Sequence, residues 1–268
     1  MFRATTAGVL AVGSLLSCGG SSSPQAPSSS PSSGTLVWQD DFDGQGLPDA
    51  SRWNYEVGLI RNNERQYYTQ ARSENARLEG GRLVIEARKE AFQGASYTSA
   101  SLTSRANWTY ARIEVRAKLP RGRGTWPAIW TLGTNIGQVG WPTCGEIDIM
   151  EHVGFDPGRI HANIHTRAYN HVQGTNKGNN TMVPKPDEEF HTYEALWTAS
   201  SIEMKVDGRS YFTFNKEPGG DPVWPFDKPQ YLILNLAIGG SWGGQRGIDD
   251  DAFPMRYEID YVRVRPGQ

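Results

Sequence analysis

The sequence lacks an excess of charge of either sign. It holds 27 lysine and arginine residues against 29 aspartate and glutamate residues, a net charge of −2 at pH 7. Domains that bind nucleic acid usually carry a basic stripe or an overall basic charge, so a nucleic-acid partner is not expected, and an uncharged polymer such as a neutral glycan fits better. The chain also lacks a phosphate-cradling Gly-Lys motif and a His-Glu-x-x-His motif, which leaves no sign of nucleotide or zinc-protease chemistry.

Long stretches of helical periodicity are missing as well. No run with apolar residues at helical spacing extends beyond a few turns, whereas 30 glycines and 16 prolines supply many turns. Length alone would allow two domains, but an all-β sandwich often uses more than ~200 residues as one domain. Hydrophobic residues make up 37% of the chain, which is enough for a core without suggesting a membrane span.

Cysteine is scarce, and one of the two cysteines lies in what reads as an export signal. Arg3 gives residues 1–18 a basic start, and an apolar run follows over residues 4–16. Residues 15–18 resemble the lipobox of a bacterial lipoprotein. We therefore expect acylation of Cys18, which would anchor the exported chain to a bacterial membrane without a transmembrane helix. A plain secretory signal with an incidental cysteine is the alternative.

The second cysteine, Cys144, is then left without a partner, so the mature domain is predicted to have no internal disulfide. No suitably spaced base suggests that Cys144 is a nucleophile, and a small packing residue is the better interpretation. Residues 19–34 contain almost only Ser, Gly, Pro, Ala and Gln. Such a composition cannot bury enough apolar surface to offset its ordering entropy, so it predicts a disordered tether before a folded domain at 35–268.

Residues 145–154 carry three acids in a pattern. Glu146 and Asp148 alternate with isoleucines, which is the period of a half-buried strand. In a regular strand Glu151 would fall on the apolar side, where an ionised carboxylate costs several kcal/mol. One extra residue near 149–150, a β-bulge, returns Glu151 to the face of the other two acids. The sequence thus predicts three carboxyl groups on one face.

Two carboxyl groups about 5–5.5 Å apart serve retaining glycosidases as nucleophile and acid/base. The Cα atoms of Glu146 and Glu151 would lie roughly 13 Å apart at ~3.3 Å per residue, and their side chains could lean together over Asp148. Like charges at close range raise one pKa, so that one carboxyl group stays protonated while another stays ionised. An acidic solvent face or a calcium patch is the alternative interpretation of the three acids taken alone.

The stretch resembles the catalytic strand of glycoside hydrolase family 16, Glu-x-Asp-x-x-Glu. The lead-in at 141–145 resembles that of its laminarinase-like branch, the endo-β-1,3-glucanases. The resemblance spans roughly residues 35–265. It implies a retaining endo-acting enzyme that cleaves β-1,3-glucosidic bonds of laminarin-type glucans, with Glu146 as nucleophile, Glu151 as acid/base and Asp148 as assisting residue.

The same resemblance implies an all-β jelly-roll sandwich of two curved antiparallel sheets, as in legume-type (concanavalin A-like) lectins, with the site in the concave cleft. The expected partner is a β-glucan, and a monomer is expected. Four alternatives remain: a mixed-linkage β-1,3-1,4-glucanase, a marine-galactan hydrolase of the same family, a non-catalytic glycan-binding module and a calcium-binding interaction protein.

Several side chains are candidates for binding sugar. Residues 61–68 resemble a laminarinase loop whose asparagine reaches the cleft, and residues 161–165 alternate with polar groups on one face. Residues 111–118 also alternate, and the resemblance places their Glu114 and Arg116 on the cleft floor, whereas a solvated outer face with cross-strand ion pairs is the alternative. Exposed tryptophans could stack on glucose rings. The predicted sugar-binding set is Asn63, Glu114, Arg116, Trp126, Trp130, Trp141, Asn163, His165, Asn235 and Trp242.

Two further features concern the scaffold. Asp207-Gly208 between alternating runs is a strong hairpin signal, and the nearly all-apolar residues 231–238 predict a central strand. The last strand is predicted to have two faces, with Tyr257, Ile259 and Tyr261 on one and Asp260, Val262 and Val264 on the other.

Family members often bind one structural calcium on the convex side. By the resemblance, its ligands here would be the backbone carbonyls of Asp41 and Gly81 and the carboxylate of Asp260, a set of oxygens suited to a hard cation. No cofactor is expected for catalysis.

Overall fold

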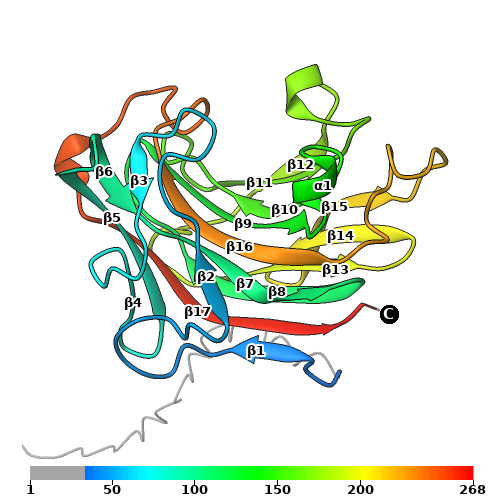
Figure 1. Ribbon diagram of the computed structural model, residues 1–268, viewed down its shortest axis with the longest axis horizontal. Coiled ribbons are helices and arrows are strands. Elements are labelled where there is room, and N and C mark those ends of the chain that lie inside the picture. Colours follow the sequence, from blue (N-terminus) through cyan, green and yellow to red (C-terminus); the bar gives the residue numbers. More distant parts are fainter. Residues whose placement is uncertain (1–33, 268) are drawn as a thin grey trace, which may run out of the picture. The chain divides into compact units, whose positions relative to one another are not determined.

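Two β-sheets make up most of the part of the chain that the computed structural model describes, residues 34–267 (Figure 1). The predicted signal peptide with Cys18, and the predicted tether up to residue 33, lie outside the described residues. Within residues 34–267, no helix is both long and apolar enough to cross a membrane.

The larger sheet has ten strands, which are β1 Trp38–Asp40, β3 Gln66–Tyr68, β4 Ala76–Leu78, β5 Leu83–Phe92, β6 Ala95–Ser99, β8 Ala111–Lys118, β13 His191–Trp197, β14 Ser201–Val206, β15 Arg209–Asn215 and β17 Met255–Pro266. Their order is β15-β14-β13-β8-β17-β5-β6-β3, with β1 paired to β17 and β4 paired to β5. The pairs are antiparallel except β3 with β6, which is parallel.

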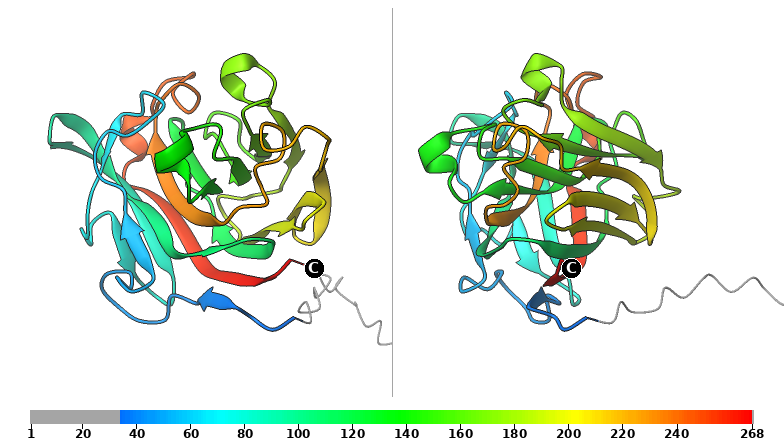
Figure 2. Two further views of the ribbon diagram at one scale, coloured as in Figure 1. Left: turned by 45° about the vertical axis from the view of Figure 1, so that its right-hand side comes forward. Right: turned by 90° about the vertical axis from the view of Figure 1, so that its right-hand side faces the viewer.

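The smaller sheet has seven strands, which are β2 Trp53–Tyr55, β7 Ser101–Trp108, β9 Thr125–Gly133, β10 Glu146–Glu151, β11 Arg159–His165, β12 Lys177–Met182 and β16 Gln230–Ile238. Their order is β12-β11-β10-β9-β16-β7-β2. Helical structure among the described residues is limited to α1 Ile136–Val139 and the short 3₁₀ turns η1 His171–Gln173 and η2 Asp250–Ala252. The predicted sandwich of two curved sheets is confirmed, and Figure 2 shows the curvature of its long strands from two sides.

The core lies between the two sheets and is built by alternation. On β8 the apolar residues Ile113, Val115 and Ala117 are buried, and the intervening polar residues are partly exposed. On the smaller sheet, Ile147 and Ile149 of β10 belong to the same core cluster. Removing the valine and isoleucine side chains among them from water stabilises the sandwich by roughly 1.5–3 kcal/mol each. The polar side of β10 is thereby turned away from the larger sheet.

The predicted hairpin and central strand are confirmed. Asp207 and Gly208 both have positive φ, 50° and 75°, as a tight two-residue connection between β14 and β15 requires. Strand β16 pairs with β9 on one side and β7 on the other, and from Leu232 to Ile238 it is buried throughout.

The predicted alternation of the last strand is wrong beyond Ile259. The pairing of β17 with β8 shifts register between Ile259 and Tyr261. Because of this bulge, Val262 and Val264 are buried on the core side, as Tyr257 and Ile259 are before it.

Candidate active site

Strand β10 is irregular at the predicted position. Opposite β9, Asp148 pairs with Trp130 and Met150 pairs with Ile129, so Ile149 is the extra residue. The pairing with β11 also shifts between Asp148 and Glu151. The predicted β-bulge is therefore confirmed, and it allows Glu151 to share a face with the two acids before it.

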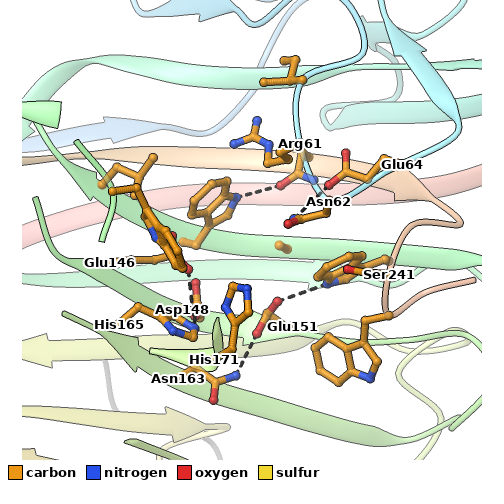
Figure 3. Close-up of a pocket in the computed structure, with 18 of the residues that line it drawn as sticks. Arg61, Asn62, Glu64, Glu146, Asp148, Glu151, Asn163, His165, His171 and Ser241 are labelled. Carbon is orange, nitrogen blue, oxygen red and sulfur yellow. Dashed lines mark hydrogen bonds and ion pairs between the residues drawn. The ribbon is translucent and has the colours of Figure 1, made fainter. Parts of the chain in front are cut away.

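All three acids of β10 line one cavity of about 850 Å³ on the open face of the smaller sheet (Figure 3). This volume is in the range of small-molecule binding sites. The cavity also contains most of the predicted sugar-binding residues, namely Trp126, Trp130, Trp141, Asn163, His165, Asn235 and Trp242. Their placement agrees with the expectation, and their roles in binding sugar stay predictions.

Indole and amide N–H groups hold the two glutamates. The Trp141 Nε1 donates a hydrogen bond to Glu146 Oε2 at 2.8 Å. Glu151 accepts one hydrogen bond on each oxygen, from Trp126 Nε1 at 3.1 Å and from Asn163 Nδ2 at 2.9 Å (Figure 3). Hydrogen bonds to carboxylates are stronger than those between neutral groups, so these donors fix where each carboxyl group points.

Burial and mutual repulsion raise the pKa values of the three carboxyl groups. Burial, followed by the charge of Asp148, raises the pKa of Glu146 well above its usual range. Burial, followed by the charge of Glu151, does the same to the pKa of Asp148. Burial also raises the pKa of Glu151, against the hydrogen bond from Asn163, which lowers it. Because each charge opposes the next, the cluster retains protons at pH values where isolated carboxyl groups are ionised.

His165 completes this cluster. Its Nε2 lies 3.2 Å from Asp148 Oδ2 and 3.6 Å from Glu146 Oε1. The ligand atoms of Glu146, Asp148 and His165 all lie within 4.8 Å of one another, a spacing that could hold a metal ion. The carboxyl groups of Glu146 and Asp148 in this set are also the ones that hydrolysis of a glycosidic bond would require.

Glu114 and Arg116 are not on the cleft floor, which corrects the expectation from the family resemblance. Strand β8 lies in the larger sheet between β13 and β17. Arg116 forms an ion pair there with Asp260, and neither Glu114 nor Arg116 lines the cavity. The outer face with cross-strand ion pairs was the correct alternative. Alternation identifies two faces of a strand but does not tell which sheet the strand joins.

One of the predicted calcium ligands is paired with an arginine. The Asp260 carboxylate accepts a hydrogen bond from Arg116 Nη1 at 2.5 Å, so a dication bound there would have to displace or repel a guanidinium group. The other two predicted ligands are the backbone carbonyls of Asp41 and Gly81. Calcium binding by this set stays a prediction, and calcium enters no step below.

The cavity-lining position predicted for Asn63 is taken by the preceding residue, Asn62. Asn62 lines the active-site cavity, whereas Asn63 lines a neighbouring pocket of about 790 Å³. Both asparagines have positive φ, 55° and 53°, so the loop does not alternate as a strand would. Other polar cavity residues outside the predicted sugar-binding set are Glu56, Arg61, Glu64, His161, His171, Asn176, Tyr231 and Ser241. Arg61, for example, lies 4.8 Å above the ring of Trp130, but a single arginine in a loop gives no sequence signal for this.

Cys144 packs rather than reacts, as predicted. It is fully buried in a small cluster with Trp130 and Leu132. Burial, followed by the charge of Glu146, raises the pKa of its thiol to about 11. A thiol that stays protonated is a poor nucleophile.

A β-sandwich whose open face presents buried, hydrogen-bonded carboxyl groups among tryptophans defines a carbohydrate-cleaving enzyme. The family model for glycosyl hydrolases family 16 matches residues 63–263. The chain therefore belongs to glycosyl hydrolase family 16.

Individual relatives agree with this membership. A β-glucanase of Rhodothermus marinus is 52% identical over 240 residues, which cover 85% of this chain and 84% of that protein. The X-ray structure of the laminarinase from Rhodothermus marinus has a TM-score of 0.84 at 51% identity and covers 86% of this chain and 96% of that one. SCLam, a non-specific endo-β-1,3(4)-glucanase of the family, has a TM-score of 0.84 at 48% identity and covers 91% of this chain and 95% of that one.

Proposed function

We propose that the chain is a retaining endo-β-1,3(4)-glucanase that cleaves laminarin-type β-glucans. The observation that carries this proposal is the bulge in β10, through which Glu146 and Glu151 reach one cavity on either side of Asp148. Glu146 attacks the anomeric carbon and forms a glycosyl-enzyme. Glu151 protonates the departing glycosidic oxygen and then activates the water that releases the sugar.

Asp148 assists by holding a proton. It lies between the two glutamates on β10, and burial together with the charge of Glu151 raises its pKa well above the usual range. A proton held on Asp148 removes a negative charge beside Glu146 and, with the N–H of Trp141, favours Glu146 as the ionised nucleophile.

The walls of the cavity suit a neutral sugar chain. The indoles of Trp126 and Trp242 meet edge to face with centroids 5.5 Å apart, and Trp141 lies 5.1 Å from the ring of His171. Aromatic rings offer apolar faces to the C–H faces of glucose, and the amides and imidazoles between them can bind its hydroxyl groups.

Mixed-linkage glucan is the second candidate substrate. It is favoured by the similarity to SCLam, of which a variant presents 1,3-β-D-cellobiosyl-glucose at its active site. A reducing-sugar assay with laminarin, lichenan, agarose and carrageenan tests both candidates. We expect product from laminarin, and from lichenan if mixed linkages are accepted. Turnover of a galactan alone would overturn the substrate class, and binding of laminarin without any turnover would indicate a binding module.

Replacing Trp141 by phenylalanine should lower kcat/KM on laminarin by about 10- to 100-fold, the loss expected for a hydrogen bond to a charged group worth ~1.5–3 kcal/mol. The change removes the N–H donor of Glu146 and keeps an aromatic ring. Because this donor favours ionised Glu146, its loss should also move the acidic limb of the pH profile to higher pH. The matched control is Trp108→Phe, at a tryptophan that packs on the core outside the cavity. Equal effects of the two changes would contradict the proposed contact.

We also propose that the protein is exported and held on a bacterial membrane by lipid at Cys18. This rests on the sequence of residues 1–18. Expressed in a bacterium, the Cys18→Ala protein should move from the membrane fraction to the soluble fraction. Mass spectrometry of the wild-type N-terminus should find an acylated cysteine, and an unmodified mature chain in the medium would refute the anchor.

A further inference from the structure

A chain of two amides leads to Glu151 from outside β10. Asn163 of β11 donates its Nδ2–H to Glu151 Oε2 at 2.9 Å. Asn176, the residue before β12, donates its Nδ2–H to the Oδ1 of Asn163 at 2.8 Å. Asn176 also lines the cavity, and it makes no direct hydrogen bond to any of the three acids.

A glycine beside Asn163 leaves space for the carbonyl oxygen of its side-chain amide. Gly178 pairs with Asn163 across β11 and β12. A Cβ atom at position 178 would lie 2.4 Å from Asn163 Oδ1, far inside van der Waals contact. The absence of that atom leaves room for the carbonyl oxygen on the side of Asn176.

The loop that carries Asn176 is itself fixed. The Thr175 amide donates to the carbonyl of Asn170 at 3.0 Å, and the Thr175 hydroxyl donates to the carbonyl of Ala168 at 3.0 Å. Asn170 is buried and accepts a hydrogen bond from the backbone of Gln173 at 3.1 Å. Asn176 is thus presented to Asn163 from an ordered turn.

The orientation of an asparagine amide decides which charge state of a neighbouring carboxyl group it stabilises. With the N–H toward Glu151, Asn163 favours the carboxylate. With the carbonyl toward Glu151, it would accept a hydrogen bond from the protonated carboxyl group and favour the neutral acid. In the structure Asn176 presents its Nδ2–H to Asn163 Oδ1, which favours the first arrangement, whereas an acceptor in its place would favour the second.

We propose that Asn176 is a positioning residue for catalysis, which fixes the amide of Asn163 so that its N–H, and not its carbonyl, faces Glu151. The inference rests on the proposed function, in which Glu151 is the acid/base. In this role Asn176 acts through Asn163 to keep the pKa of Glu151 from rising further, so Glu151 loses its proton at a lower pH. Glu151 must lose its proton to activate water in the second step, so an acid that is too weak would slow the release of the sugar.

The test is the pH profile of kcat/KM on laminarin for Asn176→Ala, Asn163→Ala and the double variant. Loss of the orienting donor should raise the pKa of the alkaline limb by up to about one unit, because a hydrogen bond to a charged group is worth ~1.5–3 kcal/mol and one unit is ~1.4 kcal/mol. If Asn176 acts through Asn163, the double variant should have the same limb as Asn163→Ala. The other titratable groups around Glu151 are unchanged in all variants, and they are Glu146, Asp148, His161, His165 and Tyr211.

Asn180→Ala is the matched control. Asn180 lies on β12, four residues after Asn176, and its Oδ1 accepts a hydrogen bond from Arg159 outside the cavity. The alkaline limb of Asn180→Ala should therefore lie at the same pH as that of the wild type. The proposal would be overturned if the alkaline limb of Asn176→Ala lay at the wild-type pH. It would also be overturned if Asn176→Ala shifted the limb by the same amount in the Asn163→Ala background as in the wild type. Should Asn176→Ala fail to fold, Asn176→Asp is the second variant. It keeps the size of the side chain and places an acceptor opposite Asn163, which should turn the amide of Asn163 around and move the alkaline limb to higher pH.

Failure of this inference and failure of the proposed function give different results. If Glu151→Gln keeps wild-type turnover, the proposed function is wrong. If Glu151→Gln is inactive while Asn176→Ala leaves the limb in place, the function stands and only the role of Asn176 is wrong.

Discussion

Glu146→Gln should reduce kcat/KM on laminarin by on the order of 10⁴-fold, because an amide cannot act as the carboxylate nucleophile in a double displacement. The substitution preserves size, and the carbonyl oxygen of glutamine can still accept the hydrogen bond from Trp141. Binding of a laminari-oligosaccharide, measured by calorimetry, should therefore survive the loss of turnover.

The same substitution should stabilise the fold above the pH at which an unfolded glutamate ionises. Burial and Asp148 raise the pKa of Glu146 in the folded state, so the folded protein binds more protons than the unfolded chain. Its stability is full below the unfolded pKa and is lost as pH rises toward the folded pKa. Glutamine removes this loss, and the thermal midpoint of Glu146→Gln at pH 8 should exceed that of the wild type.

Glu114→Gln is the control for both measurements. Glu114 lies on β8 in the larger sheet and does not line the cavity, so its turnover should equal that of the wild type. Turnover by Glu146→Gln within tenfold of the wild type would refute the double displacement proposed for this site.

Glu151→Gln should lower kcat/KM on laminarin by about 10²- to 10⁴-fold, the usual contribution of general acid–base catalysis. A glucosidic oxygen is a poor leaving group without a proton, and glutamine has none to transfer. The two donors of Glu151, Trp126 and Asn163, can still bind the amide oxygen or rearrange locally, so the fold should be retained.

The pH profile makes this prediction specific to the acid. Burial raises the pKa of Glu151, so wild-type activity should persist above the normal pKa of a glutamate and fall as pH rises through the raised value. The residual activity of Glu151→Gln should lack this alkaline limb. If the limb remained in place, some group other than Glu151 would be the acid.

The sequence predicted the bulge in β10 and missed the one in β17. A regular β10 would bury the charge of Glu151, which costs several kcal/mol, so the irregularity was predictable. A regular β17 would put Tyr261 and Arg263 on the core side in place of Val262 and Val264. A buried guanidinium carries a similar penalty, so the same criterion, applied to Arg263, predicts the second bulge.

What the sequence determined by itself is local. The two-residue period gave the faces of the strands, the turn residues gave the hairpin at Asp207, and the cost of a buried charge gave the three acids a common face. The prediction of the fold class and of the core of the site followed from these features together with the family resemblance.

Only the tertiary structure decided which strands meet. It put β8 with Glu114 and Arg116 in the larger sheet, away from the acids, and it turned Asn62 rather than Asn63 into the cavity. It also brought Asn176 to the amide of Asn163 across two strands. Strand pairing and loop conformation depend on contacts between residues distant in the chain, and a periodic pattern is the same whichever sheet a strand joins.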